Sequence, residues 1–284
     1  MSKSTWLSGL VVAGAMAWGL GTAAADPIRI GIANFGEHPQ LNASIAGFKK
    51  ALAENGFVEG QKALAGSGIP VVFSAVTDPV AAKLVPSWEA GDDGMTGATD
   101  LQDVAAVMAF TRKLLPEAKR FGVPYNPGEA NDTALLDKIK EAAPAAGFEV
   151  VEVGVDNVND IQQRIASFAG KADVIYTPAS NLLQPAIGAV SAAARQAQIP
   201  IVNSDDGAVR DGVVPASFAV NYEQVGVNAG KIAAEILKGT DPKTIAPSRP
   251  AYEDHAPLIS KKATAAFSIE VPAALAGECN CVVD

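Results

Sequence analysis

The sequence predicts an α/β protein built from parallel β-sheets that are covered by helices on both faces. Short apolar runs alternate with amphipathic helical runs along most of the chain, which is the order that such sheets require. The strand runs are almost continuously apolar, as expected where both faces of a sheet are buried and polar alternation is not needed.

The alternation can be followed from the first strand to the last helix. Strands are expected at 27–35, 69–76, 120–125, 148–155, 172–178, 199–205 and 217–222. Helices are expected at 41–56, 104–120, 132–147, 160–170, 182–198 and 224–239. Pro124 interrupts one strand run and Pro144 one helix run. After about Asp241 the periodicity is lost, and the chain is interpreted as a crossing segment followed by a short terminal piece.

Residues 1–25 have the composition of a secretory signal peptide. Lys3 precedes an apolar, uncharged run, and Ala23 to Ala25 provide the small residues typical of a cleavage site. The run is too short for a membrane-spanning helix, which needs about 20 apolar residues. No cysteine follows it that could carry a lipid anchor. We therefore expect a soluble, exported chain that begins at Asp26.

Charge and cysteine content argue against a nucleic-acid-binding protein and against a fold stapled by disulfides. The formal net charge is −9 and no dense basic run occurs, which argues against nucleic acid as a partner. The only cysteines, Cys279 and Cys281, lie near the C-terminus and cannot staple the body of the fold. A C-x-C pair could bind a metal or form a bridge, but two ligands are a weak signal, and we expect a frayed tail.

In an open parallel sheet, ligands bind beyond the carboxyl ends of the strands, and these predicted ends share one chemistry. They offer carboxylates, amides, hydroxyls or an aromatic ring, and almost no Arg or Lys. The segments are 34–38, 75–79, 125–131, 176–181, 203–206 and 221–223. Each alone could equally cap a turn or a helix, as Asp78 before Pro79 or Asn131 before a helix would. Six ends of the same kind favour a binding cleft.

Enzyme signatures are absent from this cleft. The chain has no G-x-S-x-G, H-E-x-x-H or G-x-x-x-x-G-K-[ST] motif, and its two histidines offer little for acid–base catalysis or a metal cage. Paired carboxylates among Glu37, Asp78, Glu129 and Asp205 could still act as in a glycosidase, which makes a secreted hydrolase the alternative. We favour recognition without turnover, with no cofactor and no metal.

Three short motifs are specific enough to suggest a family: E-H-P at 37–39, V-T-D-P at 76–79 and Y-N-P-G-E-A-N at 125–131. From about Ile28 to Gly239, with one gap, the chain resembles periplasmic substrate-binding proteins of ABC importers, in the group that includes tryptophan- and phenylalanine-binding members. The resemblance implies two α/β lobes that close over a small molecule and deliver it to an inner-membrane ABC permease. A ligand-sensing subunit of a membrane receptor is a further alternative.

The resemblance also implies a division of the chain and a role for each part. Residues 26–98 with 222–245 would form the first lobe, and 99–221 with 246–284 the second lobe and the crossing tail. The protein is expected to be a periplasmic monomer. Its ligand is expected to be an amino acid, with aromatic ones among the candidates, because Trp88 is the only tryptophan outside the signal and sugar sites usually stack on such rings.

The resemblance also implies a set of ligand-binding residues, whose chemistry suits the groups of a free amino acid. Carboxylates suit its ammonium group, hydroxyls and helix-start N–H groups suit its carboxylate, and aromatic rings can pack on its side chain. Asn131 is expected to cap the helix that follows it. The expected ligand-binding residues are Phe35, Glu37, Thr77, Asp78, Tyr125, Asn126, Glu129, Ser180, Asn181, Asp205 and Tyr222.

The chain also departs from the pattern of the family. An acid usually precedes the asparagine where this chain has Ser180 and Asn181, and Pro124 falls in the first strand of the second lobe. Between Gln61 and Ile69 a strand–helix–strand stretch of the family is missing, because about a dozen residues can make only one return connection. The shortened first lobe is expected to weaken or abolish binding.

Overall fold

The structure is a computed structural model that describes residues 30–32, 39–57 and 70–284. The expected signal peptide and the expected ligand-binding residues Phe35 and Glu37 lie outside the described residues. So does the whole of the shortened stretch between Gln61 and Ile69.

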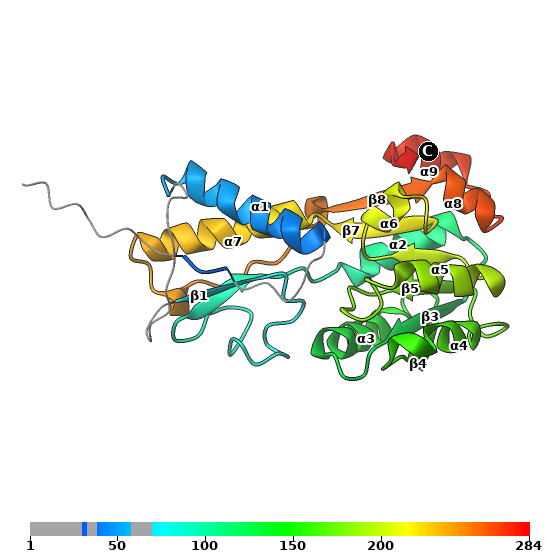
Figure 1. The fold of residues 1–284 in the computed structure, drawn as a ribbon, viewed down its shortest axis with the longest axis horizontal. Coiled ribbons are helices and arrows are strands. Elements are labelled where there is room, and N and C mark those ends of the chain that lie inside the picture. Colours follow the sequence, from blue (N-terminus) through cyan, green and yellow to red (C-terminus); the bar gives the residue numbers. More distant parts are fainter. Residues whose placement is uncertain (1–29, 33–38, 58–69) are drawn as a thin grey trace, which may run out of the picture.

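The described residues form two lobes placed end to end (Figure 1). We call small lobe the body that contains the two-stranded parallel sheet β1–β2 and its two long helices. Its elements are α1 (Pro39–Glu54), β1 (Val71–Ser74), β2 (Met95–Ala98) and α7 (Tyr222–Leu237). We call large lobe the body built on the seven-stranded sheet β4-β3-β5-β6-β7-β8-β9.

The sheet of the large lobe is mostly parallel. Strands β4, β3, β5, β6 and β7 run parallel to one another, β8 is antiparallel to β7, and β9 is parallel to β8. The strands are β3 (Arg120–Tyr125), β4 (Glu149–Gly154), β5 (Val174–Thr177), β6 (Ile201–Asn203), β7 (Ala216–Val220), β8 (His255–Ser260) and β9 (Val282–Val283). The predicted α/β fold with parallel strands is confirmed, with one antiparallel addition at β8.

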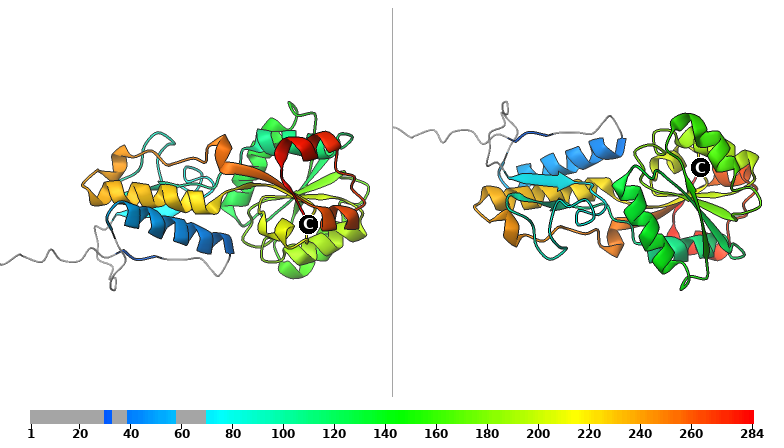
Figure 2. Two further views of the ribbon diagram at one scale, coloured as in Figure 1. Left: turned by 90° about the horizontal axis from the view of Figure 1, so that it is seen from above. Right: turned by 90° about the horizontal axis from the view of Figure 1, so that it is seen from below.

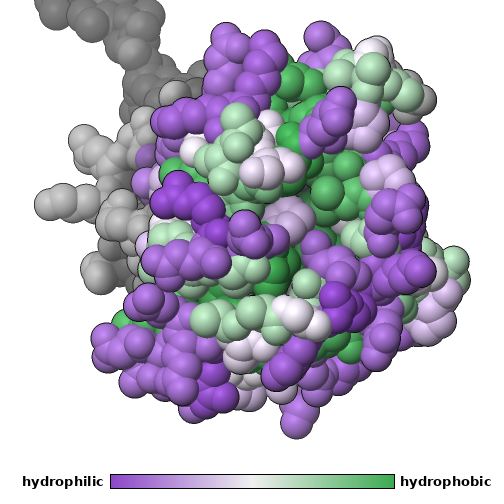
Figure 3. Space-filling model, turned by 90° about the vertical axis from the view of Figure 1, so that its right-hand side faces the viewer, coloured by the Kyte–Doolittle hydropathy of each residue, from purple (hydrophilic) through white to green (hydrophobic). Residues whose placement is uncertain are grey.

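Helices cover both faces of this sheet (Figure 2), and each face has its own apolar core. One core packs α2 and α3 against residues such as Phe121 and Tyr176, and the other packs α4 and α5 against Ile175 and Ile201. The helices of the large lobe are α2 (Val104–Leu114), α3 (Ala130–Ala142), α4 (Ile161–Ala166), α5 (Ile187–Gln196), α6 (Gly207–Arg210), α8 (Lys261–Ala266) and α9 (Ala273–Cys279). On the end that faces away from the small lobe, hydrophilic residues cover most of the surface (Figure 3).

Glycines bring the two long helices of the small lobe into backbone contact. A Cβ atom at Gly226 of α7 would lie 1.8 Å from the carbonyl oxygen of Ser44, and one at Gly47 of α1 would lie 2.0 Å from that of Glu223. Such distances are sterically forbidden, so α1 and α7 can run side by side this closely only with glycine at these positions (Figure 2). The N-terminal ends of both helices point at the large lobe (Figure 1).

Several sequence-based expectations are wrong in detail. The strand expected at 27–35 is not formed where the structure describes it, since Ile30 and Ile32 are exposed and the described ladder of β1 is made with β2. The helix expected at 104–120 ends at Leu114, just before Pro116, whose ring prevents the helix from continuing.

The expected frayed tail is also wrong. The chain after α7 returns to the large lobe, where β8 pairs with β7 and β9 pairs with β8. Cys279 and Cys281 form a disulfide, and Cys281 is buried in the core that contains α2 and α3. Long-range strand pairing holds this segment, which local periodicity did not predict.

Candidate functional site

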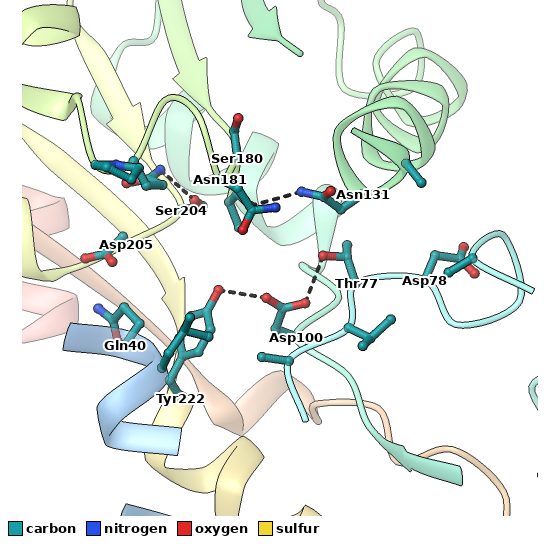
Figure 4. Close-up of a pocket in the computed structure, with 18 residues that line it drawn as sticks. Gln40, Thr77, Asp78, Asp100, Asn131, Ser180, Asn181, Ser204, Asp205 and Tyr222 are labelled. Carbon is teal, nitrogen blue, oxygen red and sulfur yellow. Dashed lines mark hydrogen bonds between the residues drawn. The ribbon is translucent and has the colours of Figure 1, made fainter. Parts of the chain in front are cut away.

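A cavity of about 330 Å³ lies between the two lobes (Figure 4). This volume is at the lower end of the range of small-molecule pockets, about 300–1,000 Å³. The lining residues come from segments at the carboxyl ends of strands and at the first turns of α1, α3 and α7. Six of the expected residues lie on its wall: Thr77, Asp78, Ser180, Asn181, Asp205 and Tyr222.

Sequence reasoning missed the carboxylate at the centre of the wall, Asp100. It follows β2, a strand that went unrecognised because Met-Thr-Gly-Ala is short and poor in β-branched residues. The side chain is 4% exposed and accepts two hydrogen bonds. Thr77 Oγ1 donates to Oδ1 at 2.9 Å, and the Tyr222 hydroxyl donates to Oδ2 at 2.7 Å (Figure 4).

The Asp100 carboxylate has no cationic neighbour on the cavity wall, where the described lining contains no Lys, Arg or His. Burial raises the pKa of Asp100, against the opposing effect of the bonds from Tyr222 and Thr77. Burial also raises the pKa of Tyr222, and the charges of Asp100 and Asp205 add to that shift. The phenol is therefore a hydrogen-bond donor held between two acids.

Asp205 lies across the cavity from Asp100, on the loop after β6 (Figure 4). Its Oδ1 accepts a 2.6 Å bond from the backbone N–H of Gly207. The loop is also fixed to the end of β6, because Asn203 Nδ2 donates to the carbonyl of Asp205 at 2.9 Å. One carboxylate oxygen thus closes a turn, and the other is left for the cavity.

Asp78 reaches the wall, but its carboxylate already has partners. Oδ1 accepts the backbone N–H groups of Val80 and Ala81, and Oδ2 pairs with Lys138 of α3 at 3.3 Å. This ion pair joins the loop after β1 in the small lobe to a helix of the large lobe. Across the same cleft, Gln40 of α1 donates to an Asp206 oxygen at 3.3 Å.

The residues of the loop between β3 and α3 lie differently from the expectation. Tyr125, Asn126 and Glu129 were expected to face the ligand, but they do not line the cavity, whereas Asn131 does. Glu129 is the N-cap residue of α3, and its side chain makes no capping bond. It turns instead to the loop after β5, whose backbone N–H groups at Asn181 and Leu182 donate to it at 2.7 and 3.0 Å.

The two hydroxyls expected to bind a ligand carboxylate are also engaged within the protein. Thr77 Oγ1 donates to Asp100, as described above. Ser180 Oγ accepts the backbone N–H groups of Leu182 and Leu183 at 3.3 Å and lies 3.4 Å from a Glu129 oxygen. These hydroxyls hold the loops that form the wall.

Further unpredicted residues complete the polar part of the wall: Gln40, Gln184 and Ser204. Gln184 Nε2 donates to Pro178 O, Asn203 Oδ1 and Ser204 Oγ, at 2.7, 2.9 and 3.2 Å. Because Ser204 Oγ accepts from Gln184, its own proton remains available to a ligand. No group of three or more His, Cys, Asp or Glu side chains in the described part of the chain could hold a metal ion.

Comparisons with known proteins agree on the kind of molecule. A family model described as ABC transporter substrate binding protein matches residues 62–283. The chain is 32% identical over 251 residues to a tyrosine-binding protein of Clostridioides difficile (strain R20291), a match that covers 74% of this chain and 72% of that protein.

Two solved structures share the fold. A conserved domain protein from Vibrio cholerae O1 biovar El Tor superposes with a TM-score of 0.79 at 29% identity, over 87% of this chain and 96% of that chain. An ABC domain from Streptococcus pneumonia in complex with L-Trp also gives a TM-score of 0.79, at 23% identity, over 88% of this chain and 97% of that chain. At that identity the second likeness concerns the fold alone. None of the described helices is long and apolar enough to cross a membrane.

Proposed function

This chain belongs to the ABC transporter substrate-binding protein family, and from that premise we propose that it captures a free amino acid between its lobes for an ABC permease. In this proposal the protein is exported by its N-terminal segment and works in the periplasm as a monomer. Residues 26–98 with 222–245 form the small lobe, and residues 99–221 with 246–284 form the large one.

The observation that carries the proposal is the buried Asp100 carboxylate, which has no cation beside it on the cavity wall. A buried charge is costly unless it is paired, so a cationic group of the ligand would supply what the protein lacks. The ammonium group of an amino acid donates three hydrogen bonds, as a Lys side chain does. Asp100 and Asp205 approach the same space from opposite sides and accept them.

The other two parts of an amino acid meet neutral groups. Its carboxylate is held by hydrogen-bond donors without a counter-charge. One such donor is the Ser204 hydroxyl, which accepts from Gln184 and donates to no other group in the described part of the chain. Its side chain packs against apolar residues of the lining, which include Leu41, Val76 and Pro185. An aromatic side chain is the proposal for the ligand, supported by the tyrosine-binding relative.

The carboxylate-pair hydrolase is the weaker interpretation of this site. Of the four acids considered for it, Asp78 is paired with Lys138 and Glu129 is saturated by N–H donors behind the wall. Glu37 lies outside the described residues. We propose that the protein binds and releases its ligand unchanged.

A thermal-shift screen of purified protein against the twenty amino acids tests the proposal. A ligand that binds only the native state raises the melting temperature. At a ligand concentration of 100 times its Kd, the free energy of unfolding rises by about 2.7 kcal/mol. We expect shifts with L-tyrosine or L-tryptophan and none with their des-amino analogues. Mass spectrometry of the incubated ligand checks for turnover. Shifts with sugars only, or conversion of the ligand, would refute the proposal.

A further inference from the structure

Glu129 connects the two loops that form one wall of the cavity, although it does not line the cavity itself. Its carboxylate accepts two bonds from the loop after β5 through the backbone N–H groups of Asn181 and Leu182. Asn181 also donates its side-chain Nδ2 to Glu129 Oε2 at 3.0 Å. From its own loop, Asn126 Nδ2 donates to Oε1 at 2.8 Å.

Asn131 is held in the same way. Its Nδ2 lies 3.4 Å from Glu129 Oε2, 3.2 Å from Asp132 Oδ1 and 3.2 Å from the carbonyl oxygen of Ala179. Figure 4 shows this amide nitrogen turned toward the loop that carries Asn181. Every acceptor around the Asn131 amide is therefore at its nitrogen end.

A side-chain amide carries donors at one end and an acceptor at the other. Where the nitrogen ends of Asn131 and Asn181 meet carboxylates, a rotated amide would place oxygen against oxygen and would be strongly disfavoured. Both residues line the cavity, and in the described part of the chain neither Oδ1 receives a hydrogen bond from the protein. The Oδ1 atoms of Asn131 and Asn181 therefore remain available to accept hydrogen bonds from a ligand.

We propose that Glu129 is a specificity-determining residue that acts through Asn131 and Asn181. By binding both Nδ2 groups it turns both carbonyl oxygens toward the ligand, so that Asn131 and Asn181 offer the ligand hydrogen-bond acceptors and no donors. Together with Asp100 and Asp205, the wall then selects a ligand with an ammonium group. The inference rests on the proposed function: the orientation of the two amides by Glu129 is what makes the cavity prefer a ligand with an amino group.

The preference has a physical basis in unpaired acceptors. A ligand that lacks the amino group leaves acceptors of the cavity lining without a donor, among them the buried carboxylate of Asp100. Sites built to hydrogen-bond a polar group of the ligand discriminate strongly against the analogue that lacks it. In Glu129→Gln, one carboxylate oxygen becomes an NH₂ donor. The amide of Asn181 can then rotate to bond that donor with Oδ1, which places Nδ2 on the cavity side and removes an acceptor from the wall.

The test is isothermal titration of L-tyrosine and of 3-(4-hydroxyphenyl)propionate, the same molecule without the amino group. The wild-type protein is compared with Glu129→Gln, with the conservative Glu129→Asp, and with Glu141→Gln as a control. Glu141 is an exposed acid of the same helix, so its replacement changes the net charge equally. We expect Glu129→Gln to reduce the preference for the amino compound about tenfold, as the loss of one charge-assisted bond predicts. Glu129→Asp should retain part of the wild-type preference for the amino compound, and Glu141→Gln should retain all of it.

A readout without ligand separates this inference from the proposed function. In nitrogen-15 NMR spectra, the amide protons of Asn181 and Leu182 should move upfield and exchange faster with solvent in Glu129→Gln than in the wild-type protein. If both compounds lose affinity equally in Glu129→Gln, or if those amide signals do not move, the inference is overturned and the proposed function stands. If the wild-type protein shows no preference for the amino compound, the proposed function is overturned together with the inference.

Discussion

Replacing Asp100 by asparagine tests most directly how the cavity recognises a ligand, because it removes a charge and almost no volume. The new amide carbonyl can still accept from Thr77, which donates to Oδ1 in the native structure. The Tyr222 hydroxyl donates to Oδ2 and would have to rotate its proton so that it accepts from the new NH₂ group. The architecture around the site is thereby kept, and only the negative charge is lost.

The magnitude follows from the position of the carboxylate. A hydrogen bond to a charged group contributes about 1.5–3 kcal/mol, and each 1.4 kcal/mol changes an equilibrium constant tenfold, so affinity for an amino acid should fall about 10- to 150-fold. The free energy of unfolding of ligand-free Asp100→Asn should be equal to that of the wild-type protein or higher. Burial without a cation penalises the ionised form, which is why the pKa of Asp100 is raised, and the neutral amide in Asp100→Asn does not carry that penalty.

Isothermal titration with L-tyrosine between pH 5 and pH 8 is the assay, with urea unfolding of the ligand-free protein alongside. Protonated Asp100 cannot pair with an ammonium group, so wild-type affinity should fall as the pH is lowered toward the raised pKa of Asp100. Asp100→Asn should lack that dependence. Asp211→Asn is the matched control, because Asp211 is an exposed acid outside the cavity wall.

The combination of outcomes decides the matter. If Asp100→Asn binds within threefold of the wild-type protein and also unfolds at lower urea, then Asp100 braces Thr77 and Tyr222 and does not recognise ligand. An affinity loss of the same size in Asp211→Asn would indicate a general electrostatic effect and would equally refute the reasoning.

Three further predictions concern stability, measured by urea unfolding. Gly226→Ala places a methyl group 1.8 Å from a backbone oxygen of α1, so α1 and α7 must separate, at a cost of about 1–3 kcal/mol. The control Gly188→Ala, where nothing lies within 4 Å, should be neutral or stabilising by about 0.5–1 kcal/mol, and similar losses in both would contradict the packing argument. The bond from Arg120 lowers the pKa of Asp173 to about 2, so the stabilisation is fully present above the unfolded pKa of about 4 and is lost as pH falls through 2. Asp173→Asn should cost about 1 kcal/mol at pH 7, given the partial exposure of the pair, and no cost at pH 7 would refute the assignment. Burial raises the pKa of Asp132 to about 7, so wild-type stability should decline as pH rises from about 4 through 7, whereas Asp132→Asn should show a flatter profile between pH 5 and 8. Parallel profiles for the two proteins would contradict that interpretation.

The local pattern of apolar and polar residues was enough to predict most of the strands and helices of the large lobe. The runs that contain Phe121, Ile175 and Ile201 are strands buried on both faces, and their apolar continuity follows directly from that burial. The position of the cavity followed as well. Because the carboxyl ends of parallel strands share one edge of a sheet, reading only those ends placed residues such as Thr77 and Asp205 beside it.

Contacts between distant segments decided the rest. Strand β2 is recognisable only by its pairing with β1, so Asp100 stayed hidden although it is the most buried acid of the cavity wall. The tail is ordered by pairing between β8 and β9, for which residues near Cys281 give no local signal.

Glu129 shows the same division at the level of one side chain. Its sequence context, a carboxylate in a polar loop at the end of a strand, predicted a residue that faces the ligand. The partner that it binds instead, the backbone at Asn181 and Leu182, lies more than fifty residues further along the chain. A carboxylate turns to the densest group of N–H donors within its reach, and those donors are assembled only when β3 and β5 lie side by side in the folded sheet.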